Sequence, residues 1–144
     1  MAQARGIGRI LVSIGGNERS LLAAQYAVAL ARLLGAELIA VYVVDTKILA
    51  GLLKARIFIQ MEERDYARDF EENGRRYLNH VRDLAEAKGV PISTILEKGE
   101  VHTIVTAKAR EMRADLLVMG EPDAPASRSA ATIRSNFFPS TASP

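Results

Sequence analysis

The chain has 144 residues, 49% of them hydrophobic, and it contains no cysteine. This length and apolar share suit one compact domain with a buried core. The lack of cysteine excludes disulfides, thiolate catalysis and cysteine-ligated metals. Nineteen Lys and Arg against 17 Asp and Glu leave a net charge of +2, too small and too evenly mixed to indicate a nucleic-acid-binding protein.

No stretch of the sequence approaches the ~20 apolar residues of a membrane span. The apolar stretch near the N-terminus is shorter than the core of a secretory signal, and no small-residue cleavage pattern follows it. We therefore expect a soluble, cytoplasmic protein that binds neither a membrane nor nucleic acid.

The first 45 residues predict a strand, a helix and a second strand. The continuous apolar run RILVSI at 9–14 is typical of a strand covered on both faces, and two glycines end it. Asn17 is a good N-cap for a helix whose apolar residues recur at helical spacing until Gly35. The run AELIAVYVV at 36–44 then predicts a second buried strand.

The middle of the chain predicts a connection followed by a long helix. Residues 45–60 are apolar without a clear period and indicate a connection with some helix. Between residues 61 and 88 the apolar positions fall on one stripe among many charges, which predicts an amphipathic helix. Gly74 should cost this helix about 1 kcal/mol relative to Ala, so we expect a kink or a break near Asn73.

Two further strands complete the pattern. The segment ISTILEKG at 92–99 predicts a strand nearer the sheet edge, a helix begins at Glu100, and ADLLVMG at 114–120 predicts a strand ended by glycine. Strand and helix alternate four times, which predicts an α/β fold: an open parallel sheet with helices on both faces, Rossmann-like.

The composition changes after Gly120. Residues 121–144 hold four of the five prolines and many Ser and Thr residues. We therefore expect an α/β domain at 1–120 and a Pro/Ser-rich C-terminal tail at 121–144, in which a short helix could form at 127–136.

Three segments, in this order, resemble the universal stress protein (UspA-like) family. They are RILVSIGGNERSLLAAQYAVALARLLGAELIAVYVVD from Arg9, GVPISTILEKGE from Gly89, and IVTAKAREMRADLLVMG from Ile104. The piece ADLLVMG is similar to the family's ADLIVMG strand and turn. The resemblance implies a five-stranded parallel sheet in the order 3-2-1-4-5 and homodimers formed through the last strand.

In nucleotide-binding members of the family, ATP lies between the loops after strands one and four. Ligands of open α/β sheets bind in the same place on physical grounds, beyond the carboxyl ends of the strands where the strand order reverses. The resemblance therefore implies a site for ATP or AMP, with Mg²⁺, whose adenosine side is lined by these residues: Ile14, Gly15, Gly16, Val43, Met119 and Gly120.

The sequence departs from the family's nucleotide-binding pattern in two places. Where the family's first turn reads Val-Asp-Gly-Ser, this chain has Ile14 to Asn17 and lacks the acidic residue. In the pattern G-x2-G-x9-G-[S/T] after the fourth strand, Gly120 fills the first place, but Asp123 and Ile133 stand where the other glycines belong. Glycines in such a loop let backbone amides approach phosphates, so we expect the standard ATP motif to be lost.

The end of the chain, SNFFPSTASP, does not match the family's closing strand Cys-Pro-Val-Leu-Val-Val. A fifth strand is therefore left open, and with it the usual dimer contact. The apolar residues 48–59 could supply a dimer surface or a lid, although packing against the sheet is the simpler interpretation.

These observations leave three hypotheses for function. The leading one is a homodimeric regulatory or interaction module of the stress response, with no catalytic residues. The alternative is an adenine-nucleotide sensor with an altered phosphate loop, in which polar residues of the tail replace the missing glycines. A slow nucleotide hydrolase, with Asp123 as its carboxylate, is less favoured. The tail residues of the sensor hypothesis are Ser127, Arg128, Ser129 and Arg134, which a solvated tail would also explain.

Other candidate residues favour structure over chemistry. The glycine pair after the first strand could accept a ligand, but a tight strand-to-helix turn explains it equally simply. His80 and His102 are far apart in sequence, so we expect no metal site. No Walker A loop, G-x-S-x-G turn or H-E-x-x-H helix occurs in the sequence.

Overall fold

The computed structural model describes residues 6–15, 18–47, 50–51, 63–120 and 131–135. Helices and strands alternate along the chain from β1 to β4, and β5 follows. The elements are β1 (Arg9–Ile14), α1 (Glu18–Leu34), β2 (Glu37–Asp45), α3 (Glu63–Ala87), β3 (Ile92–Gly99), α4 (Val101–Glu111), β4 (Leu116–Gly120) and β5 (Ala131–Ser135). In the connection after β2, residues 46–47 and 50–51 are helical, and the suggested dimer surface or lid at 48–59 lies largely outside the described residues.

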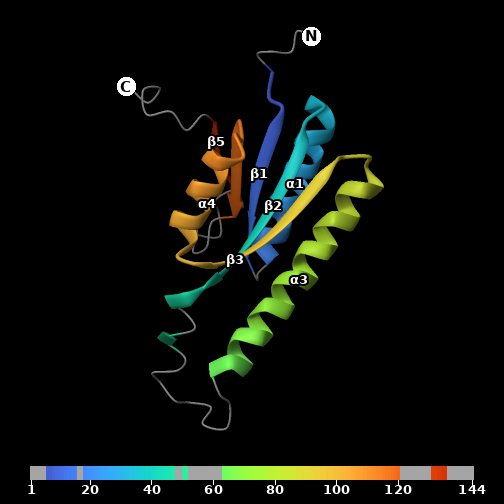
Figure 1. Cartoon of the computed structure of the whole chain (residues 1–144). Coiled ribbons are helices and arrows are strands. Elements are labelled where there is room, and N and C mark those ends of the chain that lie inside the picture. The colour runs from blue at the N-terminus through green and yellow to red at the C-terminus, as the bar shows by residue number, and fades with distance from the viewer. Residues whose placement is uncertain (1–5, 16–17, 48–49, 52–62, 121–130, 136–144) are drawn as a thin grey trace.

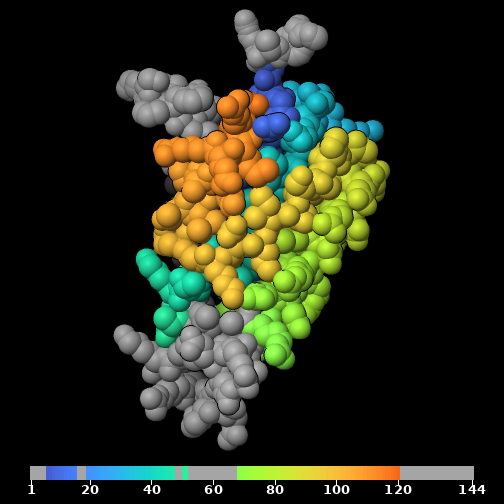
Figure 2. All heavy atoms as spheres, in the orientation of Figure 1, coloured from blue at the N-terminus to red at the C-terminus, as the bar shows by residue number. Residues whose placement is uncertain are grey.

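The strands form one sheet in the order β3-β2-β1-β4-β5. Strands β1 to β4 pair in parallel, with α1 and α3 on one face and α4 on the other (Figure 1). Figure 2 looks onto the α4 face, where α4 lies beside β3 and α3 runs along one side. The predicted fold class, an open Rossmann-like α/β sheet, is confirmed.

The fifth strand corrects two expectations. Residues 131–135 form a strand, where the sequence suggested a short helix at 127–136. This strand is antiparallel to β4, where the family resemblance implied an all-parallel sheet. Only residues 121–130 separate the two strands, and a parallel crossover normally needs a dozen or more residues. Because β5 is the edge strand, prolines near it do not interrupt a central ladder.

The two faces of the sheet have separate cores because side chains alternate along each strand. Val12 packs with the α1 and α3 residues, whereas Leu11 packs with α4. Strands covered on both faces bury nearly every side chain, which explains the continuous apolar runs of the sequence.

The long helix α3 continues through Gly74, so the expected break near Asn73 is wrong. A Cβ at Gly74 would lie 2.6 Å from Tyr42 Cδ1 and 2.8 Å from Leu96 Cδ1. The glycine therefore lets the helix approach β2 and β3 closely. The Tyr42 ring stacks on Tyr77 of the same helix at a centroid distance of 6.2 Å, and burial raises the pKa of the Tyr42 hydroxyl.

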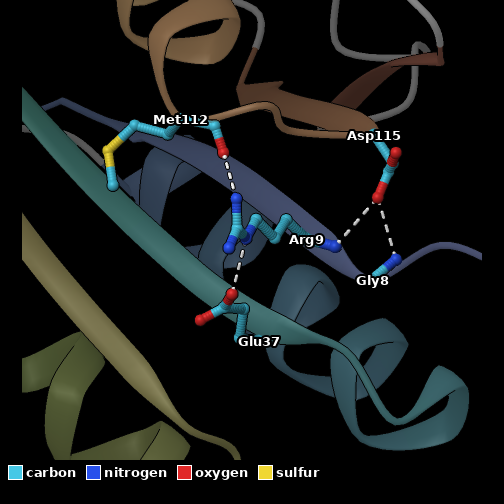
Figure 3. A network of polar contacts seen from close by, with 5 residues as sticks. All are labelled: Gly8, Arg9, Glu37, Met112 and Asp115. Atoms are coloured by element: carbon cyan, nitrogen blue, oxygen red, sulfur yellow. Dashed lines mark hydrogen bonds and ion pairs between the residues drawn. The ribbon is translucent and has the colours of Figure 1, made fainter.

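Polar contacts fasten the amino-terminal end of the sheet (Figure 3). The Asp115 carboxylate accepts hydrogen bonds from the backbone N–H of Gly8 at 2.9 Å and of Arg9 at 3.1 Å. The Arg9 guanidinium donates from Nε to Glu37 at 2.6 Å and from Nη1 to the Met112 carbonyl at 3.0 Å. These contacts, which we call the Arg9–Asp115 network, join β1 to β2 and to the segment between α4 and β4.

Candidate functional site

The candidate site lies at the carboxyl end of the sheet, between β1 and β4, where the strand order reverses. From β1 the chain moves to β2 and β3 on one side, then crosses to β4 on the other. Loops that leave neighbouring strands in opposite directions open a crevice there, and ligands of open α/β sheets bind in it. The register pairs Ser13 with Val41 of β2 and with Met119 of β4, so these three positions lie side by side near the switch point.

The structure brings most of the predicted nucleotide residues to this end of the sheet, with their side chains on different faces. Ile14 is buried in the core beneath α1 and α3. Val43 and Met119 belong to the α4 face. Gly15 follows β1 and Gly120 ends β4, while Gly16 lies outside the described residues. Side chains on the α4 face and backbone at the two glycines therefore make up the candidate site.

The turn after β1 is fastened by a serine that the sequence analysis did not single out. The Gly15 N–H donates to Ser20 Oγ at 2.7 Å, and Ser20 is buried in the first turn of α1. A Cβ at Gly15 would lie 3.0 Å from the same oxygen. This hydrogen bond occupies the Gly15 amide, so that amide is committed to the strand-to-helix turn.

Gly120 lets β4 end directly against the first turn of α1. A Cβ at this position would lie 2.9 Å from the Arg19 carbonyl oxygen and 3.2 Å from the Ser20 nitrogen. Both are backbone atoms of a helix, which cannot rotate away as a side chain could. The glycine after this strand therefore has a packing role.

Ser13 is the second polar residue that the sequence analysis missed. Among the described residues, Ser13 and Ser20 are the only polar side chains that are buried. Alternation along β1 directs Ser13 to the same side as Leu11, the α4 face. A serine within an apolar strand was the available sequence signal, because a buried hydroxyl requires a hydrogen-bonding partner.

The N-terminus of α4 lies at the same end of the sheet because β3 runs parallel to β1. Its N-cap is Glu100, whose carboxylate accepts from the Thr103 hydroxyl and, at 2.9 Å, from the Thr103 amide. These hydrogen bonds, with a smaller effect of Lys47, hold the pKa of Glu100 below its ordinary value. The carboxylate caps its own helix.

The positions of the family's phosphate pattern are only partly described. Asp123 and residues 127–129 lie outside the described part of the chain. Ile133, in the place of the third glycine, is in β5 opposite Val118. Arg134 pairs with Leu117, three residues from Gly120, which corresponds to about 10 Å along the strand. The backbone of Arg134 is therefore some distance from the carboxyl end of β4.

A hollow of about 340 Å³ lies at the opposite, amino-terminal end of the sheet. Its lining includes Arg9, Glu37, Ser93 and Met112. The Arg9 guanidinium there pairs with the Glu37 carboxylate and the Met112 carbonyl. The carboxylate of Glu111, which also lines the hollow, lies 3.4 Å from Lys108 Nζ, so each charged side chain of the lining already has a partner.

The described residues offer no metal centre. Among them, no three His, Cys, Asp or Glu side chains are grouped to hold an ion. His80 is exposed on α3 and His102 is exposed on α4, on opposite faces of the sheet.

Within the described ranges, no helix has the length and apolarity required to cross a membrane.

The sheet order, the helices on both faces and the switch point between β1 and β4 define an open, Rossmann-like α/β domain. The sequence pattern of the universal stress protein family matches residues 6–141. The chain therefore belongs to the universal stress protein family.

Individual relatives agree with this assignment. Universal stress protein MJ0531 of Methanocaldococcus jannaschii is 32% identical over 112 residues, a match that covers 78% of this chain and 63% of the relative. This chain thus spans less than two thirds of that relative. A crystal structure of a universal stress protein family member from Burkholderia pseudomallei is 28% identical, with a TM-score of 0.67 over 80% of this chain and 82% of that one.

A universal stress protein crystallised in complex with cAMP has the same fold. It is 23% identical, with a TM-score of 0.53 over 78% of this chain and 71% of that one. At this identity, the similarity supports the fold alone.

Proposed function

We propose that this protein is a regulatory module of the stress response that acts through protein contacts and works as a homodimer. We further propose that it does not hold ATP in the standard phosphate loop. The observation that carries the proposal is Gly120. Its backbone is in close contact with the first turn of α1, so the one retained glycine of the family's phosphate pattern has a packing role.

Two further observations support the loss of the phosphate loop. The amide of Gly15, the residue that follows β1, already donates to Ser20. The third glycine of the pattern is replaced by Ile133, whose backbone is paired with β4. Phosphate-binding loops work through free backbone N–H groups on a flexible glycine loop, whereas the Gly15 N–H is already bonded and Ile133 lies in a strand.

An adenine-nucleotide sensor is the second candidate, and Ser13 favours it. A buried hydroxyl on the α4 face beside Met119 is well placed to meet a polar edge of a ligand at the switch point. The cAMP named in the complex of a structural relative is a ligand of the same chemical class. In this second candidate the base and ribose supply most of the contact, and the phosphates supply little.

Calorimetric titration of the full chain with ATP, AMP and cAMP, each with Mg²⁺, decides between the two. Heat no different from dilution supports the regulatory module. Saturable binding at micromolar strength contradicts the proposed loss of ATP binding and favours the sensor. In that case Ser13→Ala should weaken affinity by about tenfold, the usual cost of an unpaired polar group. The matched control Ser93→Ala, in an exposed position of β3 at the amino end, should leave affinity unchanged.

A further inference from the structure

The large apolar side chains that remain exposed among the described residues all lie on α1. Leu22 is 50% exposed, Tyr26 49%, Leu33 79% and Leu34 43%. The buried side of the same helix packs on the sheet through small residues such as Ala27. The outer side of α1 therefore carries four large apolar side chains beside the exposed Gln25 and Arg32, whereas the outer side of a surface helix is normally polar.

The exposed apolar residues follow the spacing of a helix-pairing seam. Leu22, Tyr26, Ala29 and Leu33 are separated by four, three and four residues, and all four are exposed. This is the a/d spacing with which one α-helix packs along another. We call these four residues the α1 stripe.

We propose that the α1 stripe is covered by the same stripe of a second copy of this chain, with the two helices antiparallel about a two-fold axis. This inference rests on the proposed homodimer and names its contact surface, which differs from the last-strand contact that the family resemblance implies. A two-fold interface uses one patch on both copies, so the patch must be complementary to itself.

The stripe meets this requirement in the antiparallel arrangement. Positions 22 and 33, and likewise 26 and 29, are equally distant from the midpoint of the stripe between 27 and 28. Leu22 therefore lies opposite Leu33 of the partner subunit, and the large Tyr26 lies opposite the small Ala29 of the partner subunit. A parallel pair would set two tyrosine rings at one level and two alanines at another, which packs poorly.

The size of the stripe fits a specific but modest dimer. With Leu34 included, its exposed surface is on the order of 400 Å², the size of the largest apolar patch on a typical monomer. Pressing two such faces together, with their flanking residues, removes on the order of 1,000 Å² from water, the lower limit for a specific interface.

The first test is the mass of the full chain in solution. Light scattering and sedimentation velocity should give a dimer for the natural sequence. Leu33→Asp should raise the dissociation constant of the dimer by at least about tenfold, because it places a charge in the seam. Ala107→Asp, which adds the same charge at an exposed position of α4 on the other face, should change it less than about twofold. Circular dichroism is recorded for both variants, and each should give the spectrum of the natural chain.

The outcomes separate the two proposals. A monomeric natural chain overturns the homodimer and the α1 surface together. A dimer that Leu33→Asp leaves intact keeps the homodimer but overturns the α1 surface, and it points to the sheet edge or another contact.

The register can be tested directly because the natural chain has no cysteine. An equimolar mixture of Leu22→Cys and Leu33→Cys chains should form a disulfide-linked heterodimer under mild oxidation. Leu22→Cys alone should not, since positions 22 of the two copies lie about 16 Å apart along the helices, too far for a disulfide. Cross-linking of Tyr26→Cys with itself and not of the 22/33 mixture would overturn the antiparallel arrangement.

Discussion

Replacing Gly120 with alanine would place a methyl carbon against the backbone of α1. That carbon would lie 2.9 Å from the Arg19 carbonyl oxygen and 3.2 Å from the Ser20 nitrogen, where ordinary contacts begin at 3.4 Å. To make room, the end of β4 and the first turn of α1 must separate by several tenths of an ångström. Overpacking of this kind costs about 1–3 kcal/mol.

The gain from replacing a glycine offsets part of that cost. A glycine-to-alanine change restricts the unfolded chain and stabilises by about 0.4–1 kcal/mol where the backbone conformation allows alanine. Gly120 is not among the described glycines with positive φ, so alanine is allowed there. We therefore expect Gly120→Ala to lower the free energy of unfolding by about 1–2 kcal/mol, or the melting temperature by roughly 3–8 °C.

Urea denaturation followed by circular dichroism measures this change. Gly8→Ala is the matched control, because the nearest atom to its Cβ, Asp115 Oδ2, is 3.8 Å away and the residue has no positive φ. The control should be neutral or slightly stabilising. If Gly120→Ala were as stable as Gly8→Ala, the packing argument would be refuted, and the open backbone at Gly120 would be better explained by a ligand.

Three further substitutions test other parts of the structure. Gly74→Ala should destabilise by about 1–2 kcal/mol despite the better helix propensity of alanine, because its Cβ would meet the stacked Tyr42 ring at 2.6 Å; a more stable variant in urea denaturation would contradict this. Ser20→Ala should cost about 1–2 kcal/mol in the same assay, since it removes the acceptor of the Gly15 N–H, and a loss near zero would mean that water replaces the hydroxyl. Glu100→Gln should destabilise the fold at neutral pH and progressively less as pH falls below 4.5. The lowered pKa of Glu100 means that its negative charge stabilises the fold, and this contribution is lost when the carboxylate becomes protonated. A difference in stability that does not change with pH would contradict the cap.

The strands and the long helix could be predicted because burial on two faces leaves a plain pattern in the sequence. The predicted strand at 9–14 matches β1, and the predicted helix at 61–88 matches α3 within two residues. The role of Gly74 in an unbroken α3 could not be judged from propensity, because the glycine makes room for the Tyr42 ring, 32 residues away in sequence. The fifth strand was left open, and its position and antiparallel direction could not be predicted, because five residues in a Pro/Ser-rich tail carry no strand pattern of their own.

The position of the candidate site could be predicted from the sequence, but the directions and hydrogen bonds of its side chains could not. The switch point follows from strand order, which the alternation of elements and the family resemblance supply. The direction of each side chain depends on register, and register separates Ile14 from Val43 and Met119. The hydrogen bond from Gly15 to Ser20 depends on how α1 leaves the turn, which propensity does not specify.

The Arg9–Asp115 network has a consequence for how this fold can change over time. At the amino-terminal end of the sheet it joins β1, β2 and the segment between α4 and β4. Its side chains contact neither the turn after β1 nor the end of β4. Mutations that accumulate in the loops of the carboxyl end therefore leave these anchoring contacts in place. A chain built in this way can change the loops at the carboxyl end of its sheet, and with them a ligand or partner, without disturbing the contacts at the other end.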